Sequence, residues 1–379
     1  MYIYDNESDR EGIHMETVYK SGEVNSIVDM VANKLKSCTF IVYCADDKRF
    51  GEISKKLHEK LPNVQMMGTT GFMFDEKGSF ADGISAIGFE DSDVEVHTGV
   101  LRQVDTCPMK YLPDLERAVQ KIKQHYKNNI CFEVSTGYEE SVVSTMKICL
   151  EEAGIRLIGG TAGNTEPDQP KHVAYNGEVL TDSTVYAVIG SKIGNIEIFK
   201  ENLYHASKIT HSVTKVSDDK RTIYEIDGRK AMDVYEEELG YTSANVGDGV
   251  FKNPLCRIVG EDSYITAIFS FNPDRSITTY KNILENDVIS FSHIDQEYQR
   301  FIEDNIRSLT DSRKVAGIMS VNCILRYLYF ENNHYIDTYA DMMSSMASNC
   351  HWGVVGDGEQ YVEQHINQSM VCIIFTRDK

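Results

Sequence analysis

No stretch of this sequence is apolar for long enough to cross a membrane. The longest apolar runs, such as residues 315–321, have the length of a strand and fall far short of the roughly 20 residues of a membrane-spanning helix. The N-terminus has neither the basic segment nor the apolar segment of a secretion signal. We therefore expect a cytoplasmic protein with no membrane insertion.

Cysteine pairs and catalytic signatures are missing as well. The nine cysteines include no C-x-x-C pair, so we expect reduced, buried thiols and no disulfides or zinc. The motifs H-E-x-x-H, G-x-S-x-G and G-x-x-x-x-G-K-[ST] do not occur. Because catalysis has no chemical anchor here, we expect a protein that is not an enzyme and carries no metal. An enzyme of unknown chemistry stays open as a third alternative.

Basic side chains are outnumbered by acidic ones. The 379 residues include 58 Asp and Glu against 38 Lys and Arg, which gives a formal net charge of −20. Such a surface repels phosphate backbones, so nucleic acid is not an expected partner. Hydrophobic residues still make up 41% of the chain, which is enough for a sizeable core, and the length suggests two or three domains.

What the sequence does contain is one pattern of elements that occurs three times. Each unit is expected to run strand, helix, strand, glycine turn and strand. The opening strands are predicted at residues 39–44, 130–135 and 315–321, and the closing strands at residues 83–89, 184–190 and 369–375. These pseudo-repeated units predict an α/β fold of the mixed α+β type with mixed sheets, and they leave the strand order open.

A purely β pattern follows the second unit, and a helix is predicted after it at residues 229–239. Strand-like runs follow one another after residue 190, with polar turns between them. We expect the chain to divide near Asp227 and Gly228, into parts at residues 25–227 and 228–377.

Each unit also carries a G-x-x-G sequence after its second strand, at residues 68–71, 160–163 and 353–356. Glycines at a strand exit permit a sharp turn and leave backbone N–H groups that suit an anion or a carboxylate. The alternative is a tight structural turn with no ligand, and the sequence leaves both open. For the ligand hypothesis, we expect at least two of the motifs to face one shared cleft.

Arg326 is the strongest candidate for a charged ligand contact, and Arg257 is the second. Arg326 lies just after an apolar strand-like run, where its guanidinium group could hold a carboxylate through two parallel hydrogen bonds. The alternative is an internal ion pair, whose loss would cost folding stability. No histidine pair has the spacing of a helical metal site, so the histidines are expected to be structural or at the surface.

Five motifs, in the right order, resemble the FIST sensory family over residues 25–377. They are Gly68-Thr69-Thr70-Gly71; Ile158-Gly159-Gly160-Thr161-Ala162-Gly163-Asn164; Val213-Thr214-Lys215 followed by Tyr224-Glu225-Ile226-Asp227-Gly228, Ala231 and Tyr235; Cys323-Ile324-Leu325-Arg326; and Gly356-Asp357-Gly358-Glu359 followed by His365-Ile366-Asn367-Gln368-Ser369. The resemblance implies an N-terminal FIST part at residues 25–227 and a C-terminal FIST part at residues 228–377.

This resemblance implies a non-catalytic, cytoplasmic signal-input module that binds a small ligand such as an amino acid. Its expected partner is a signalling protein, such as a histidine kinase, a chemoreceptor signalling domain or a cyclic-di-GMP enzyme, either separate from the chain or joined to it. We expect the ligand to lie between the two parts, against Gly68, Thr69, Thr70, Gly71, Gly160, Thr161, Gly163, Asn164, Arg257, Arg326, Gly356, Glu359 and Asn367.

A haem-binding nitric-oxide sensor is the second alternative, because some similar proteins are described in that way. His205 would then be the axial ligand of the haem iron. The family often has His-Gly-Trp where this chain has His205-Ala206-Ser207. Because of this departure we expect that His205 does not bind haem and that the chain needs no cofactor.

Overall fold

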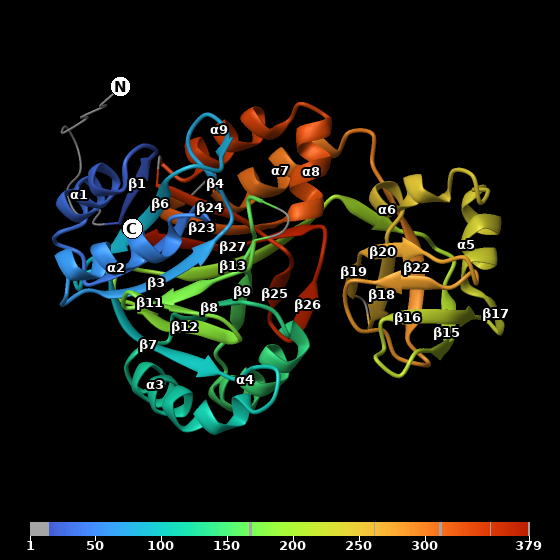
Figure 1. Ribbon diagram of the computed structural model, residues 1–379, viewed down its shortest axis with the longest axis horizontal. Helices are drawn as coiled ribbons and strands as arrows, with labels where there is room; N and C mark the ends of the chain where they lie inside the picture. Colours follow the sequence, from blue (N-terminus) through green and yellow to red (C-terminus); the bar gives the residue numbers. More distant parts are fainter. Residues whose placement is uncertain (1–14, 167–168, 261, 311–312, 349, 378–379) are drawn as a thin grey trace.

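Three repeats of one order of elements and a β-rich insert make up the protein (Figure 1). The computed structural model describes residues 15–166, 169–260, 262–310, 313–348 and 350–377. The mixed α/β fold and the three similar units predicted from the sequence are confirmed.

The repeats are contiguous in the chain except where the insert interrupts the third one. The first contains β1 (Glu16–Lys20), α1 (Val24–Lys34), β2 (Phe40–Ala45), α2 (Phe50–Lys60), β3 (Gln65–Thr70), β4 (Phe72–Phe74), β5 (Ser79–Phe80) and β6 (Ile84–Phe89). The second contains β7 (Val94–Arg102), η1 (Pro108–Tyr111), α3 (Leu112–His125), β8 (Asn129–Ser135), α4 (Glu139–Ala153), β9 (Leu157–Thr161), β10 (Val173–Tyr175), β11 (Glu178–Leu180) and β12 (Ser183–Ser191). The third contains β13 (Ile196–Asn202), α7 (Tyr298–Thr310), β23 (Lys314–Cys323), α8 (Ile324–Asn332), α9 (Ile336–Met346), β24 (His351–Gly356), β25 (Glu359–Tyr361), β26 (Gln364–Ile366) and β27 (Ser369–Arg377).

Each repeat supplies four neighbouring strands of a six-stranded sheet, and the three sheets have the same design. Their strand orders are β1-β6-β2-β3-β10-β11, β7-β12-β8-β9-β25-β26 and β13-β27-β23-β24-β4-β5. In each sheet two parallel strands, such as β2 and β3, are joined through helix, as a parallel pair requires. The closing strand, such as β6, runs antiparallel beside the first of them.

At one edge of every sheet, the last two strands come from a different repeat. Hairpin β4–β5 of the first repeat pairs with β24 of the third, hairpin β10–β11 of the second with β3 of the first, and hairpin β25–β26 of the third with β9 of the second. The exchange is therefore cyclic. Each repeat covers a strand edge of one neighbour, and no edge next to the glycine motifs stays unpaired.

Alternation along the strands sets the packing of the three sheets. On β2, Phe40 and Val42 face a central core that all three sheets share, whereas Ile41 and Tyr43 face helices α1 and α2. Helices α3 and α4 cover the outer face of the second sheet in the same way, and helices α7, α8 and α9 cover that of the third. The result is an inner core between sheets and an outer layer of helices (Figure 1).

The insert lies between β13 and α7 and has a core of its own. It contains β14 (Tyr204–Ala206), β15 (His211–Val216), β16 (Thr222–Ile226), β17 (Arg229–Lys230), α5 (Ala231–Leu239), η2 (Val246–Asp248), α6 (Gly249–Lys252), β18 (Leu255–Val259), β19 (Asp262–Thr266), β20 (Ile268–Phe271), β21 (Ile277–Thr279) and β22 (Val288–Ile294). The strands form one nine-stranded sheet. Figure 1 shows this insert, in yellow and orange, beside the three-repeat body.

The division expected near residue 227 lies inside the insert. Asp227 and Gly228 both have positive φ angles, 52° and 71°, and form the tight turn between β16 and β17. Residues 25–227 and 228–377 therefore both supply strands to the nine-stranded sheet, and β13 of the third repeat lies before the division.

Candidate functional site

The glycine motifs lie largely within strands, which corrects the expectation that they are turns. Residues 353–356 belong entirely to β24, and Gly68 and Gly160 lie inside β3 and β9. A Cβ on Gly68 would overlap the ring of Tyr43. Glycine is therefore needed at these positions for close packing between neighbouring strands.

The ends of the three motifs meet at one buried point in the middle of the molecule. A Cβ on Gly163 would lie 2.5 Å from the carbonyl oxygen of Val355 and 3.4 Å from the Cα atoms of both Gly71 and Gly356. Two of the motifs also bond to one another, since Gly163 N donates to Thr70 O at 3.0 Å and Thr70 Oγ1 donates to Gly163 O at 2.7 Å. The motifs thus come together as predicted, but in a packed junction whose backbone groups bond to one another.

Two polar residues of the predicted site make local bonds near this junction. Thr69 is buried and its hydroxyl donates to Thr70 O at 3.2 Å. The side-chain amide of Asn164 donates to Gln169 O at 2.9 Å. The Thr69 contact lies at the end of β3, and the Asn164 contact lies in the segment that follows β9.

Arg326 is buried away from any surface and forms an ion pair with Glu201 of β13. Both side chains have 0% of their surface exposed. The guanidinium group also lies over two rings, with its Cζ 4.6 Å from the centroid of Phe330 and 5.5 Å from that of Tyr339. This geometry matches the internal ion pair that the sequence left open as the alternative to a ligand contact.

The start of the second helix of each repeat meets a hairpin, or the approach to one, from another repeat. In the first repeat Phe50 of α2 stacks on His172, before β10, with ring centroids 6.3 Å apart. In the third repeat Tyr327 of α8 stacks on Phe72 of β4, with centroids 5.0 Å apart. In the second repeat the contact is polar, because Glu140 of α4 meets His365 of β26.

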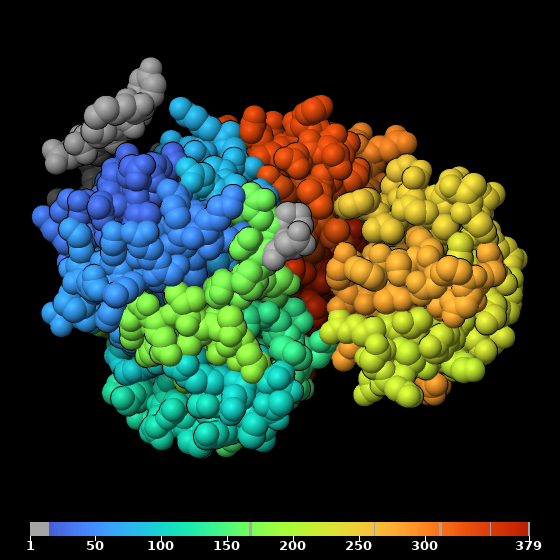
Figure 2. All heavy atoms as spheres, viewed as in Figure 1, coloured from blue at the N-terminus to red at the C-terminus, as the bar shows by residue number. Residues whose placement is uncertain are grey.

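This polar junction opens into the groove between the three-repeat body and the insert. Figure 2 shows a deep groove between the yellow-orange insert and the rest of the molecule, with red atoms of the C-terminal segment inside it. A cavity of about 420 Å³ lies here. The charged residues that line it are Lys147, Lys220, Arg257, Lys281, Glu140 and Glu363, beside His365.

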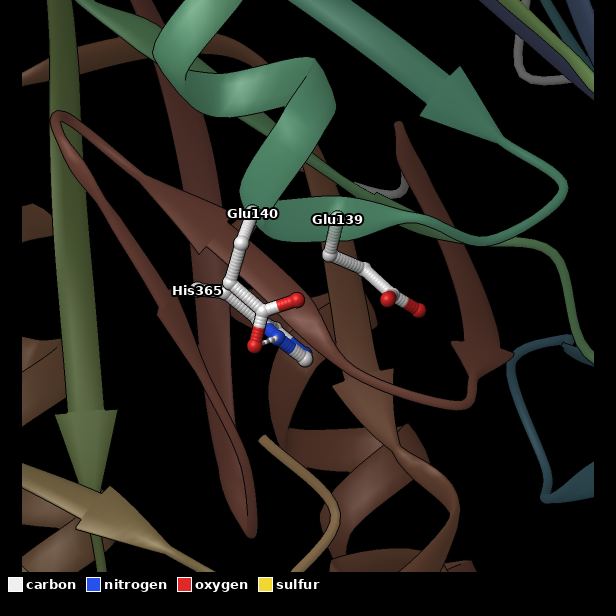
Figure 3. Close-up of side chains that lie close together, drawn as sticks. All are labelled: Glu139, Glu140 and His365. Carbon is white, nitrogen blue, oxygen red and sulfur yellow. Dashed lines mark ion pairs between the residues drawn. The ribbon is translucent and has the colours of Figure 1, made fainter. Parts of the chain in front are cut away.

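A left-handed turn before α4 brings two carboxylates to the junction. Gly137 and Tyr138 have φ angles of 137° and 57°, and α4 begins directly after them with Glu139 and Glu140. Acidic side chains are favourable in the first turn of a helix. Figure 3 shows both carboxylates beside the ring of His365, from the hairpin of another repeat.

Glu140 connects the body to the insert. Its Oε1 accepts a hydrogen bond from Asn282 N at 2.8 Å, and its Oε2 accepts one from Arg221 at 3.2 Å. Burial alone would raise the pKa of Glu140, but His365, Asn282 and Arg221 outweigh burial and lower this pKa to about 2. Glu140 is therefore a carboxylate at neutral pH.

Lys281 is a second link between insert and body. Its side chain is buried, and Nζ donates to His365 O at 2.8 Å. Burial, with a smaller contribution from Arg257, lowers the pKa of Lys281 to about 7. Arg257 itself is partly exposed in the cavity and pairs with Asp287 at 2.8 Å.

Of the remaining predicted site residues of the second and third repeats, Thr161 and Asn367 contact this polar junction, whereas Glu359 and Gly356 pack against β9 and the segment that follows it. Thr161 Oγ1 donates to Glu139 at 2.8 Å, and Asn367 Nδ2 lies 3.3 Å from His365 Nε2. Glu359 pairs with Gly160 in the sheet, is fully buried and accepts a bond from Ser369 Oγ at 2.9 Å. A Cβ on Gly356 would overlap Thr161 O.

The groove therefore collects Arg257, with Thr161 and Asn367 nearby, and it adds residues that the sequence prediction did not select. These are Glu139, Glu140, Lys281 and His365. His365 lies within one of the five motifs, and Glu139 and Glu140 begin α4 in the structure, but no local pattern connects Lys281 with them. The first-repeat glycines and Arg326 belong to other places in the fold.

His205 lies on β14 opposite His293 of β22, with their ring centroids 5.9 Å apart. Its Nε2 is 3.7 Å from Asp295, and 41% of its side chain is exposed. The neighbouring cavity, of about 520 Å³, is lined by Asp295, Gln296, Glu297, Arg300, Phe301 and Asp304. The lining is thus mostly polar and acidic.

Comparison with known proteins identifies the family. The FIST N domain matches residues 39–229 and the FIST C domain matches residues 231–361. The uncharacterized protein MJ1623 of Methanocaldococcus jannaschii is 24% identical over 306 residues, which are 73% of this chain and 56% of that relative. The chain thus spans about half the length of the curated relative it matches.

No helix within the described residues is both long and apolar enough to pass through a bilayer. The two family matches follow each other in the expected order and together cover most of the sequence. The chain belongs to the FIST family of signal-transduction sensory domains, which is a sensory and non-enzymatic family.

Proposed function

We propose that this chain is a cytoplasmic sensory module that binds a small zwitterionic metabolite, such as an amino acid, in the groove between the three-repeat body and the insert. The output passes to a signalling protein such as a histidine kinase, a chemoreceptor signalling domain or a cyclic-di-GMP enzyme. In this proposal the chain does no chemistry on its ligand.

The observation that carries the proposal is the pairing of charges in one cavity. Arg257, Lys220 and Lys281 offer donors to a carboxylate, and Glu140 and Glu363 offer acceptors to an ammonium group. A volume of about 420 Å³ lies within the usual range of small-molecule sites. In a chain with a net charge of −20, a cavity with more cations than carboxylates favours a ligand with a carboxylate.

Polar contacts across the groove support a link between binding and shape. The insert bonds to the body through Asn282 N and Glu140, through Lys281 and His365 O, and through Val250 O and Gln368. A ligand that contacts both the body and the insert favours a closed position of the insert over an open one. Binding therefore increases the fraction of molecules in the closed position. The partner protein would read that change.

The test is a thermal-shift screen of the full chain against amino acids and related metabolites, with a chelator present. A ligand that binds only the folded state at a hundredfold excess over Kd adds about 2.7 kcal/mol of stability. The Arg257→Gln variant should bind at least tenfold more weakly. Arg102→Gln is the matched control, because Arg102 also pairs with a carboxylate, Glu178, on the outer surface. No shift with any member of the panel, or equal shifts in both variants, would contradict the proposal.

We further propose that the chain works without haem. The polar, acidic lining near His205 does not suit a porphyrin, whose faces are apolar and whose propionates are negative.

A further inference from the structure

We propose that Glu139, Glu140 and His365 bind a divalent transition-metal ion, of the class of Zn²⁺ or Mn²⁺, at the inner end of the groove. This inference goes beyond the proposed function, because it concerns an ion and does not need the metabolite.

The distances between the three side chains suit one shared ion. One ligand atom from each residue lies within 4.8 Å of those from the other two. His365 Nδ1 is 3.6 Å from Glu140 Oε1, which is too long for a hydrogen bond. Two ligands bound to one zinc ion at about 2.0–2.1 Å in tetrahedral geometry are roughly 3.4 Å apart, so only a small movement is needed.

An independent observation points to a ligand of His365. The residue is 6% exposed, and its Nδ1 makes no hydrogen bond among the described residues although it faces Glu140 (Figure 3). A buried imidazole nitrogen without a bond is costly, and an ion would satisfy it.

Asn367 sets the orientation of this ring from the other side. Its Nδ2 lies 3.3 Å from His365 Nε2, and its Oδ1 accepts a long bond of 3.4 Å from Ala267 N of the insert. Binding of an ion through Nδ1 requires the ring proton on Nε2. The Asn367 amide must then rotate so that its oxygen accepts that proton, as outer-shell partners of metal-bound histidines do. This rotation breaks the hydrogen bond from Ala267 N to Asn367 Oδ1, so binding of an ion changes a contact between the body and the insert.

At the inner end of the groove, the carboxylate of Glu139 also favours a cation. Glu139 accepts the Thr161 hydroxyl and forms no ion pair among the described residues, while Glu140 is paired with Arg221 through its second oxygen. A set of two carboxylates and one imidazole mixes oxygen and nitrogen ligands, which suits Zn²⁺, Mn²⁺ or Fe²⁺ better than Mg²⁺ or Ca²⁺. The two equivalent junctions in the other repeats hold the ring pairs Phe50–His172 and Phe72–Tyr327, and among the described residues they offer no such set.

The test uses the full chain after removal of metals with a chelator, in the absence of any amino acid. Zn²⁺ is titrated by calorimetry, and Co²⁺ is titrated by its visible absorption, which reports the coordinating atoms. We expect one ion per chain. Glu139→Gln and His365→Gln should each weaken binding at least tenfold.

Glu151→Gln is the matched control, because Glu151 is an exposed carboxylate on the same helix, α4, where it pairs with Lys147 outside the three-residue set. It should leave Zn²⁺ affinity unchanged. The melting temperature of each variant shows that it is folded, and Glu139→Gln, at a partly exposed helix start, keeps the test valid if His365→Gln does not fold. The absence of equimolar binding, or equal affinities in the three variants, would overturn the inference. Because the metabolite screen is done with a chelator present, neither of these outcomes decides whether a metabolite binds.

Discussion

At the residue scale, burial decides which charged side chains hold the fold and which can meet a ligand. Arg326 and Arg257 look alike in the sequence, and each has a carboxylate partner in the structure. Arg326 has no exposed surface, whereas 24% of the Arg257 side chain is exposed in a cavity. Only Arg257 can therefore give up its contact with Asp287 and bind a small molecule instead.

Replacing Arg326 should therefore destabilise the protein. Arg326→Met leaves Glu201 buried without a partner, which costs about 3–5 kcal/mol. The double variant Arg326→Met with Glu201→Gln removes the unpaired charge and should regain part of that loss. Chemical unfolding of the two variants and the original chain measures both effects. If Arg326→Met unfolds at the original midpoint while metabolite binding is lost, Arg326 is a ligand contact.

His351 should make the protein sensitive to acid. Burial lowers the pKa of His351 to about 3, and its Nε2 lies 2.8 Å from Ser320 Oγ. In the unfolded chain the residue titrates near 6.5, so the unfolded state gains the proton first as the pH falls. The contribution is complete above about pH 6.5 and is lost between about pH 6.5 and 3.

The variant His351→Gln isolates this effect, because glutamine keeps a polar contact with Ser320 and does not titrate. Between pH 6.5 and 5 the free energy of unfolding should fall by about 2 kcal/mol more in the original chain than in the variant. Unfolding curves measured across this range check the difference. Parallel pH profiles for the two proteins would show that His351 does not supply it.

His205 gives a prediction about cofactors. Because its surroundings are acidic and its side chain is 41% exposed, added haem should find no specific site there. Haem titrated into the purified chain should give the same weak absorption change in the original protein and in His205→Ala. A strong Soret band at one equivalent, absent from His205→Ala, would establish the haem sensor instead.

At the element scale, the glycine motifs and the exchanged hairpins join the three repeats. The sequence predicted the units because the periodicity of strands and helices is local. It did not predict the exchange, since the pairing of β4 with β24 or of β25 with β9 joins segments far apart in the chain. Whether a G-x-x-G segment forms a turn or belongs to a strand depends on what surrounds its glycines, such as the Tyr43 ring beside Gly68.

Gly71→Ala tests the central junction. Gly71 has a φ of 150°, and a Cβ there would overlap Val355 O. Gly137→Ala is the matched control, with a φ of 137° and nothing within 4 Å of the added Cβ. Both variants carry the cost of an unfavourable backbone, but only the first adds overpacking, of about 1–3 kcal/mol. Melting temperatures compare them, and equal losses would show that the three motifs do not meet.

At the scale of the whole molecule, the candidate site exists only because three distant segments come together. Glu140 belongs to the second repeat, Lys281 to the insert and His365 to the third repeat. The sequence prediction selected Thr161, Arg257 and Asn367 near this place, but a groove between a body and an insert leaves no local pattern. Because the sequence does not show which distant segments meet, it also led us to expect ligand contacts from the motif residues that pack at the central glycine junction.

The central claim is that a small zwitterion binds between the body and the insert. Hydrogen–deuterium exchange of the full chain, with and without the amino acid that gives the largest thermal shift, tests it most directly. The account predicts slower exchange at three places that line the cavity, residues 140–147, 281–284 and 363–365, and unchanged exchange at the central glycine junction. Slower exchange confined to the glycine junction or to the region of His205, with none along the groove, would contradict it.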